Sequence, residues 1–259
     1  MQKTYESNLT FEGVCLIILL VLSLFLGLVS GCATSPSQAQ KQSLKRDALG
    51  HRPGPMGFKT VIIDAGHGGH DSGAQGRAKG AVEKKLALDT AERLKKKLSG
   101  KFKVILLRGN DKFIDLDDRV AFANRYESAI LVSLHYNSGP SSLRGPETYY
   151  WRVDSYSLAR RIQWEMEKVS PKEHGNRGLV RRRLRLTRNP VIPSVLVEFG
   201  YLSNAREVQL CVQSSYRDQM ASAVARAIIA QNAKGDQGTG KLPPPINKPL
   251  SKALDPPGS

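Results

Sequence analysis

Two histidines and two glutamates occupy positions where an open α/β sheet assembles a site. His67 lies in the glycine-rich sequence Asp-Ala-Gly-His-Gly-Gly that follows an apolar run, and His135 directly follows a second apolar run at residues 129–134. Glu83 opens an amphipathic stretch 16 residues after His67, and Glu198 closes a third apolar run. Because the carboxyl ends of parallel strands share one edge of a sheet, we expect these side chains to converge.

The residue types favour a zinc ion. Two histidines with one carboxylate are a common catalytic zinc set, in which the fourth position is left to water. The glycines beside His67 leave the backbone free to turn and leave room for a metal and a substrate. One histidine in a glycine-rich loop carries little weight alone. Four ligand-type residues at three strand ends and one helix start indicate a catalytic zinc site.

Strands and helices alternate along residues 58–233, which predicts an α/β domain. A helix is expected at residues 83–98, where Leu86, Thr90 and Leu94 form one stripe. Strands are expected at residues 102–107, 129–134, 146–151 and 194–199, and further helices from Asp115, at 155–169, after Asn204 and at 216–231. These elements would bring the four candidate side chains to one edge of a single catalytic domain.

Several motifs occur together in one order along the chain. They are Asp-Ala-Gly-His-Gly-Gly at 64–69, Glu83, Ser-Leu-His-Tyr-Asn at 133–137 and Val-Glu-Phe-Gly-Tyr-Leu-Ser-Asn at 197–204. In this order they resemble the zinc-dependent N-acetylmuramoyl-L-alanine amidases of the amidase-3 family. The resemblance covers roughly residues 58–233. It implies a twisted, mostly parallel (mixed) sheet flanked by helices.

The resemblance implies that His67, Glu83 and His135 bind zinc and that Glu198 is the catalytic base. Zinc held in this way polarises an amide carbonyl and activates water, and a separate carboxylate passes the proton to the leaving amine. The place of Glu198 after an apolar strand predicts partial burial and a raised pKa. Two other readings of Glu198 stay open, a fourth ligand or a buried salt bridge. Glu83 has a second reading too, because helix starts favour acidic residues.

Residues beside the ligands also have two readings. His70 and Asp71 either hydrogen-bond the first histidine or lie on the loop surface. Asn137 either orients the second histidine or binds substrate. Arg119 and Asn124, on the helix before the strand of the second histidine, are expected to be structural.

Residues 1–31 are interpreted as a signal peptide with a lipoprotein-type cleavage site. Residues 14–29 are nearly all apolar but short for a membrane span of ~20 residues. They lead into Val-Ser-Gly-Cys, which resembles the bacterial lipoprotein cleavage site and makes Cys32 the lipid-bearing residue. Lys3 is offset by two glutamates, so an uncleaved N-terminal anchor stays open. Either reading exports the domain, and we expect it in the periplasm.

The composition of residues 32–57 predicts a flexible tether, and residues 234–259 predict a disordered tail rich in Pro, Gly and Lys. A lipid on Cys32 would leave Cys211 as the one remaining cysteine of the mature chain. The sequence therefore predicts no intramolecular disulfide, and we expect Cys211 to be an inert residue packed in a helix.

The formal net charge is +16, and six arginines gather in one segment: Arg177, Arg181, Arg182, Arg183, Arg185 and Arg188. Such a run commonly binds nucleic acid or an anionic surface. Nucleic acid fits badly with an export signal, and no aromatic residues interleave with the run for base stacking. The run is expected to meet the carboxylates of peptidoglycan stems or anionic lipids, or to be only a solubilising face.

Together these features predict a lipid-anchored zinc amidase. It would cleave the amide between the lactyl group of N-acetylmuramic acid and L-alanine in peptidoglycan, in cell-wall remodelling and daughter-cell separation. Two other classes stay open, a non-catalytic wall-binding lipoprotein and a zinc peptidase acting on the stem peptide. Between His135 and Glu198 no spare amphipathic segment carries an acidic residue placed to block the zinc, so an unblocked site is expected. The oligomeric state does not follow from the sequence.

Overall fold

Six strands form one mixed sheet in the computed structural model, which describes residues 53–244. Their order across the sheet is β2-β1-β3-β6-β4-β5, and the neighbouring strands are parallel except for the antiparallel pair β4 and β6. The strands are β1 (Thr60–Ala65), β2 (Lys103–Leu106), β3 (Ala129–Asn137), β4 (Glu147–Tyr150), β5 (Gly178–Arg181) and β6 (Ser194–Tyr201). The predicted α/β fold with a mostly parallel, mixed sheet is confirmed.

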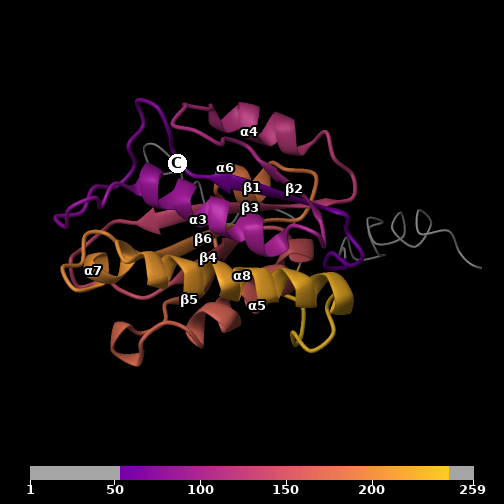
Figure 1. The fold of residues 1–259 in the computed structure, drawn as a ribbon. Coiled ribbons are helices and arrows are strands. Elements are labelled where there is room, and N and C mark those ends of the chain that lie inside the picture. The colour runs from indigo at the N-terminus through magenta and orange to yellow at the C-terminus, as the bar shows by residue number, and fades with distance from the viewer. Residues whose placement is uncertain (1–52, 245–259) are drawn as a thin grey trace, which may run out of the picture. The chain divides into compact units, whose positions relative to one another are not determined.

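Helices cover the two faces of the sheet unequally (Figure 1). The larger layer packs against one face and consists of α3 (Glu83–Leu98), α5 (Tyr156–Glu167) and α8 (Ser214–Lys234). The smaller layer covers part of the other face with α4 (Leu116–Ala123) and α6 (Arg185–Arg188). The remaining short elements are η1 (Val153–Ser155), η2 (Lys172–His174) and α7 (Glu207–Cys211). Most of the buried apolar surface therefore lies on one side of the sheet.

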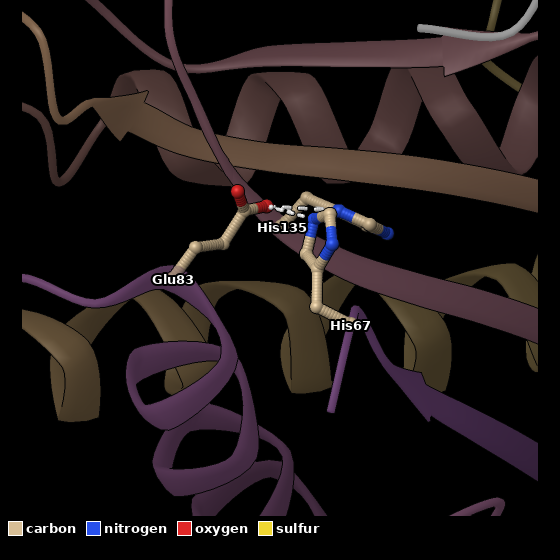
Figure 2. A group of neighbouring side chains, drawn as sticks. All are labelled: His67, Glu83 and His135. Atoms are coloured by element: carbon tan, nitrogen blue, oxygen red, sulfur yellow. Dashed lines mark hydrogen bonds and ion pairs between the residues drawn. The ribbon is translucent and has the colours of Figure 1, made fainter. Parts of the chain in front are cut away.

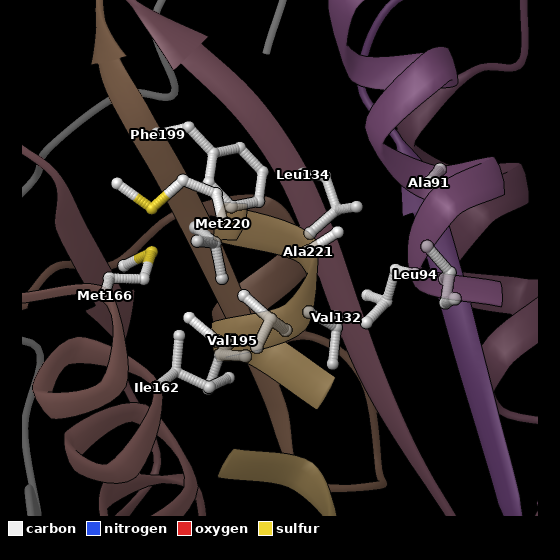
Figure 3. Packing of buried hydrophobic residues seen from close by; sticks show 14 of the residues in the cluster. Ala91, Leu94, Val132, Leu134, Ile162, Met166, Val195, Phe199, Met220 and Ala221 are labelled. Atoms are coloured by element: carbon white, nitrogen blue, oxygen red, sulfur yellow. The ribbon is translucent and has the colours of Figure 1, made fainter. Parts of the chain in front are cut away.

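Strand alternation separates this core from the polar residues of the site. Along β3, Val132 and Leu134 belong to the larger core, whereas Ser133 and His135 point to the opposite face. Along β6, Val195 and Phe199 join the larger core (Figure 3), as does Val197. Glu198 therefore shares its face with His135. Burial of the apolar set thus fixes which side chains can take part in chemistry.

The predicted packing and capping signals act as expected. The α3 stripe of Leu86, Thr90 and Leu94 is buried, and the Thr90 hydroxyl donates to the Leu86 carbonyl at 2.8 Å. Asp115 caps α4 by accepting from the backbone N–H of Asp117 at 2.8 Å. Asn204 accepts from two backbone N–H groups at the start of α7. Cys211 on α7 is fully buried, as predicted for a packing residue.

Two features differ from the sequence-based reading. The arginine-rich segment, for which no element was predicted, contains strand β5 and helix α6. The packed domain also extends beyond residues 58–233 on both sides. The Asp236 carboxylate accepts from the backbone N–H of Gly54 at 3.0 and 2.9 Å, and Thr239 is fully buried. Composition alone cannot show such contacts, because they join segments far apart in the sequence.

The other predictions about the chain ends concern residues that the structure does not describe. The signal peptide, Cys32, most of the tether and residues 245–259 lie outside the described range of 53–244. Within that range, no helix is both long enough and apolar enough to cross a membrane.

Leu94→Ala tests the larger core. Leu94 is fully buried between α3 and the sheet, so its truncation removes apolar contacts and leaves a cavity. We expect a loss of about 2–5 kcal/mol in the free energy of unfolding, measured by urea denaturation. Leu88→Ala is the matched control, because Leu88 lies on the same helix but is only partly buried, and its loss should be clearly smaller. Equal losses would contradict the assignment of the buried stripe.

Candidate metal centre

Three of the four predicted site residues meet around one point. His67 comes from the loop after β1, Glu83 from the first turn of α3 and His135 from β3 (Figure 2). The Glu83 Oε1 atom lies 3.0 Å from His67 Nε2 and 2.9 Å from His135 Nδ1. The three candidate ligand atoms lie within 4.8 Å of one another, and all three residues are buried.

The donor set fits a transition-metal ion. Four-coordinate zinc takes imidazole nitrogen and carboxylate oxygen at about 2.0–2.2 Å, which puts neighbouring ligand atoms roughly 3.3 Å apart. The observed separations from Glu83 Oε1 are close to this value. Imidazole ligands also favour Zn, Cu, Fe or Ni over Mg or Ca, which prefer oxygen ligands. The geometry therefore matches a small ion held by two nitrogens and one oxygen.

Glu83 is held as an anion. Its Oε2 atom accepts from the backbone N–H of Ala74 at 2.7 Å, and its Oε1 atom accepts from that of Tyr136 at 3.1 Å. Burial alone would raise the pKa of Glu83, but hydrogen bonds with His135 and His67 outweigh burial and lower it to about 2. The start of α3 favours the same negative charge. The position of Glu83 at the start of α3 thus favours the same ionised carboxylate that a metal ligand requires.

His67 is oriented by the carboxylate of Asp71. The Nδ1 atom of His67 lies 2.7 Å from Asp71 Oδ2, which leaves Nε2 to face the ligand group. Burial lowers the pKa of His67, but hydrogen bonds with Glu83 and Asp71 outweigh it, so the pKa is raised. His70 does not contact His67 in this way. Its ring packs on Phe113, with centroids 4.2 Å apart.

A chain of buried polar groups connects the two histidines. His135 Nε2 lies 3.1 Å from the Ser133 hydroxyl, which donates to Asp64 Oδ2 at 2.6 Å. Asp64 pairs with Arg119 at 2.5 Å, and Arg119 also donates to the backbone carbonyl of His67 at 2.9 Å. Burial opposes the ionised form of Asp64, but the positive charge of Arg119 outweighs it and lowers the pKa of that carboxyl. Arg119 therefore has the structural role expected of it.

The backbone at the first ligand is strained and tightly packed. His67 has φ 61°, the one positive value for a non-glycine residue in the part of the chain described here. Such conformations persist only where their surroundings hold them, and they gather at functional sites. A Cβ atom at Gly66 would lie 2.3 Å from His135 Cε1, and one at Gly73 would lie 2.6 Å from His67 Cδ2. These glycines make room for neighbouring ligands.

Glu198 lies next to His135 but does not belong to the group of candidate ligands. In the parallel register of β3 and β6 it pairs with His135, and it is 8% exposed. Its Oε2 atom has no hydrogen-bond partner within the described residues, and Glu198 there makes no ion pair. Burial, then the charges of Glu83 and Glu147, raise the pKa of Glu198 well above its usual range. The described residues therefore support neither the fourth-ligand reading nor the buried salt bridge.

Sequence reasoning missed a second buried carboxylate. Glu147 on β4 lies directly opposite Glu198 in the antiparallel pairing with β6 and is 2% exposed. It accepts hydrogen bonds from Asn137 Nδ2 at 2.9 Å and from the Tyr201 hydroxyl. Asn137 thus binds Glu147 and not the second histidine. Alternation within residues 146–151 could have put Glu147 on one face, but its partner strand was not readable from the sequence.

A second missed residue is Arg108, which is buried just after β2. It donates to the backbone carbonyls of Ala65, Gly66 and Lys84 at 2.7–2.8 Å. These bonds join the ligand loop to the start of α3, the helix that carries Glu83. An arginine after a short strand gives no signal of this role in the sequence.

The fold is similar to that of solved N-acetylmuramoyl-L-alanine amidases. The chain superposes on N-acetylmuramoyl-L-alanine amidase AmiC2 of Nostoc punctiforme with a TM-score of 0.63 and 34% identity, over 67% of this chain and 97% of that one. It superposes equally on the N-acetylmuramoyl-L-alanine amidase from Clostridium difficile 630, with a TM-score of 0.63 and 31% identity, over 68% of this chain and 97% of that one.

Residues 61–230 match the family model described as N-acetylmuramoyl-L-alanine amidase, and the chain belongs to this family. It is 35% identical over 177 residues to N-acetylmuramoyl-L-alanine amidase LytC of Bacillus subtilis, a match that covers 66% of this chain and 35% of LytC. The shared part is therefore the domain that carries the site, and it spans about a third of LytC.

Asp71→Asn tests the orientation of His67. The amide cannot hold the imidazole as the carboxylate does, so we expect about 10–100-fold weaker binding of a transition-metal ion. The measurement is a competition titration against a chromophoric chelator. Asp111→Asn is the control, because Asp111 also bonds the ligand loop, at the backbone N–H of Gly69, but touches no ligand. The same affinity in both variants would disprove the role of Asp71.

Proposed function

We propose that this protein is a zinc-dependent N-acetylmuramoyl-L-alanine amidase that acts on peptidoglycan. The observation that carries the proposal is the buried group of His67, Glu83 and His135 beside Glu198, whose Oε2 atom has no hydrogen-bond partner among residues 53–244. Membership of the amidase family and similarity to enzymes named for this reaction support it. The bond cleaved is the amide between the lactyl group of N-acetylmuramic acid and L-alanine of the stem peptide.

His67, Glu83 and His135 would hold the zinc ion. When bound, zinc supplies Lewis acidity that polarises an amide carbonyl and lowers the pKa of water. Asp71 and the chain of Ser133 and Asp64 keep the two imidazoles in fixed orientations. Fixed ligands reduce the reorganisation that the reaction requires.

Glu198 is the proposed general base and then the general acid. Its carboxylate takes a proton from the attacking water as the new C–O bond forms, and it delivers that proton to the nitrogen of L-alanine as the C–N bond breaks. The products are a muramic acid carboxyl group and a peptide with a free amino terminus. A pKa raised by burial and by neighbouring carboxylates suits both steps, because the group must accept and release a proton near neutral pH.

We also propose that the site is not blocked by the chain's own segment between β3 and β6. That segment contains β4, α5, β5 and α6. Among residues 53–244, none of its acidic side chains joins the group of His67, Glu83 and His135. This supports an enzyme whose site is open without displacement of a helix.

The function is tested by digestion of purified peptidoglycan with the full-length protein, followed by mass spectrometry of the products. We expect peptides that begin with L-alanine and glycan strands that keep the lactyl group. Cleavage inside the stem peptide would identify a peptidase instead. No cleavage by the zinc-loaded protein would favour a wall-binding protein without activity.

Glu198→Gln separates an enzyme from a protein that only holds zinc. The amide can hydrogen-bond but cannot accept the proton of water, so turnover should fall about 10²–10⁴-fold. Zinc content should stay at one ion per chain, since Glu198 lies outside the ligand group. His135→Ala is the paired control and should lose the metal. Loss of zinc from Glu198→Gln would make Glu198 a ligand, and unchanged turnover would remove the proposed base.

We further propose that the protein is exported to the periplasm, anchored through a lipid on Cys32, and acts in cell-wall remodelling and daughter-cell separation. The support is the Val-Ser-Gly-Cys sequence after the apolar run at residues 14–29. About 20 residues separate Cys32 from Pro53, the first described residue, and they would span at most ~70 Å when extended. A tether of this length lets the domain reach the wall.

Growth with labelled palmitate tests the anchor. The wild-type protein should carry the label and Cys32→Ala should not, because no other residue in the cleavage-site sequence can take the lipid. Cys211→Ala is the control and should keep the label. Label on both Cys32→Ala and the wild type, or on neither, would refute lipid attachment at Cys32.

A further inference from the structure

Five of the six arginines in the arginine-rich segment fall into two groups with different surroundings. Three of its members are engaged away from the site. Arg181 donates to the backbone carbonyls of Trp151 and Pro244 at 3.0 and 2.7 Å. Arg185 pairs with Asp117, and Arg188 donates to the side chain of Asn189 at 2.7 Å. These contacts give each of the three a partner other than the residues of the site.

Arg182 belongs to the other group and lies on the same sheet face as Glu198. It follows β5 two residues after Val180, which packs with Tyr149 and Leu196 on that face. Its guanidinium carbon lies 5.8 Å from the centroid of the Tyr149 ring. Its positive charge is close enough to oppose the rise in the pKa of Glu198. Within residues 53–244, Arg182 has no carboxylate at ion-pair distance.

Arg177 directly precedes β5, and β5 lies on the side of β4 opposite to β6, the strand of Glu198. Its Nε atom is 3.5 Å from Glu147 Oε1, and its guanidinium carbon is 5.7 Å from the centroid of the Tyr201 ring. Its side chain is 39% exposed. Glu147 Oε1 already accepts from Asn137 and Tyr201, so this ion pair is long. A guanidinium has five N–H donors, and the ion pair with Glu147 is made by the Nε atom.

The two tyrosines hold these guanidinium groups in place. The Tyr201 hydroxyl donates to Glu147, and the Tyr149 hydroxyl lies 3.4 Å from Asn137 Nδ2. Both rings are therefore fixed by hydrogen bonds, and each offers its face to an arginine. A guanidinium positioned before binding loses less freedom when it meets a carboxylate.

The order of the strands places these arginines on the side of Glu198 opposite to the metal-ligand residues. The metal-ligand residues come from the β1 and β3 side, Glu198 lies on β6, and Arg177 and Arg182 flank β5 beyond β4. If Glu198 delivers the proton to the leaving nitrogen, the leaving peptide lies next to Glu198. An extended peptide advances about 3.3–3.6 Å per residue, so an acidic residue after L-alanine carries its carboxylate only a few ångströms further.

We propose that Arg177 and Arg182 form a carboxylate-binding subsite for the leaving stem peptide. The subsite selects stems in which the residue after L-alanine has a free carboxylate over stems in which that carboxylate is amidated. Charge-assisted, bidentate hydrogen bonds from arginine to carboxylate supply the preference. This inference rests on the proposed amidase function, because it takes the stem peptide as the ligand.

The test compares two synthetic muramoyl peptides that differ only in a carboxylate or a carboxamide on the residue after L-alanine. For the acidic substrate, Arg182→Gln and Arg177→Gln should each raise KM about tenfold in the full-length, zinc-loaded protein, with kcat within about twofold. For the amidated substrate, the wild type should already show the higher KM, and neither variant should raise it further. Arg188→Gln removes the same charge from the same segment and should leave both substrates unchanged.

Binding of the acidic product peptide by calorimetry gives a second readout that needs no turnover. Both variants should weaken it about tenfold, and Arg182→Lys should recover only part of the loss because lysine lacks the planar fork. Zinc content and the thermal midpoint check that each variant is folded. If Arg182→Gln does not fold, Arg177→Gln and Arg182→Lys carry the test.

Three results would overturn the subsite. The first is an equal KM of the wild type for the two substrates. The second is a rise in KM in Arg188→Gln as large as that in Arg182→Gln. The third comes from a sedimentation assay with phosphatidylglycerol vesicles, if Arg177→Gln and Arg182→Gln lose binding to the vesicles while their KM values stay unchanged. The second result would show that the arginines act only through the long-range positive charge of the segment. The third would show that the arginines bind an anionic lipid surface and not the stem peptide. If the wild type cleaves neither substrate, the amidase function fails, whereas the calorimetry still decides whether the arginines bind the acidic peptide.

Discussion

The ion pair between Asp64 and Arg119 is the interaction on which the rest of the site depends. Both side chains are nearly inaccessible to solvent, and they lie on different elements, β1 and α4. Taking two charges out of water is costly, so the pair persists because each partner has further hydrogen bonds. Asp64 accepts from Ser133, and Arg119 donates to the backbone of the first ligand loop. Removing one partner would leave a buried charge within reach of both histidines.

The two faces of the sheet divide stability from chemistry. The apolar residues of β1, β3 and β6 that alternate with the site residues pack under α3, α5 and α8. The smaller helices cover only part of the opposite face, so the rest of that face can carry polar groups. Glu83 is the exception, because it reaches the site from a helix of the larger layer. The position of this ligand therefore depends directly on how well that helix packs on the sheet.

The sequence predicted the elements that carry the ligands but not the contacts that hold them. Apolar runs before His67, His135 and Glu198 located three strands, because buried parallel strands are continuous and apolar. The antiparallel pairing that places Glu147 opposite Glu198 was not predictable, since it depends on long-range strand order. The division of the arginine-rich segment was hidden for a related reason. Charge density dominates its composition, whereas its short strand and helix are set by packing against β4, β6 and α4.

The contact between Gly54 and Asp236 has a mechanical consequence. It brings the two ends of the described chain together, and Gly57 bonds Asn232 nearby while Lys59 bonds Ser128 at the start of β3. The chain thus enters and leaves at the end of the sheet where the parallel strands begin, and the ligand group lies at the end where they finish. The N-terminal end of the described chain and the ligand group thus lie at opposite ends of the parallel strands. A force applied to the N-terminal end of the described chain would therefore act at the end of the sheet opposite to the ligand group.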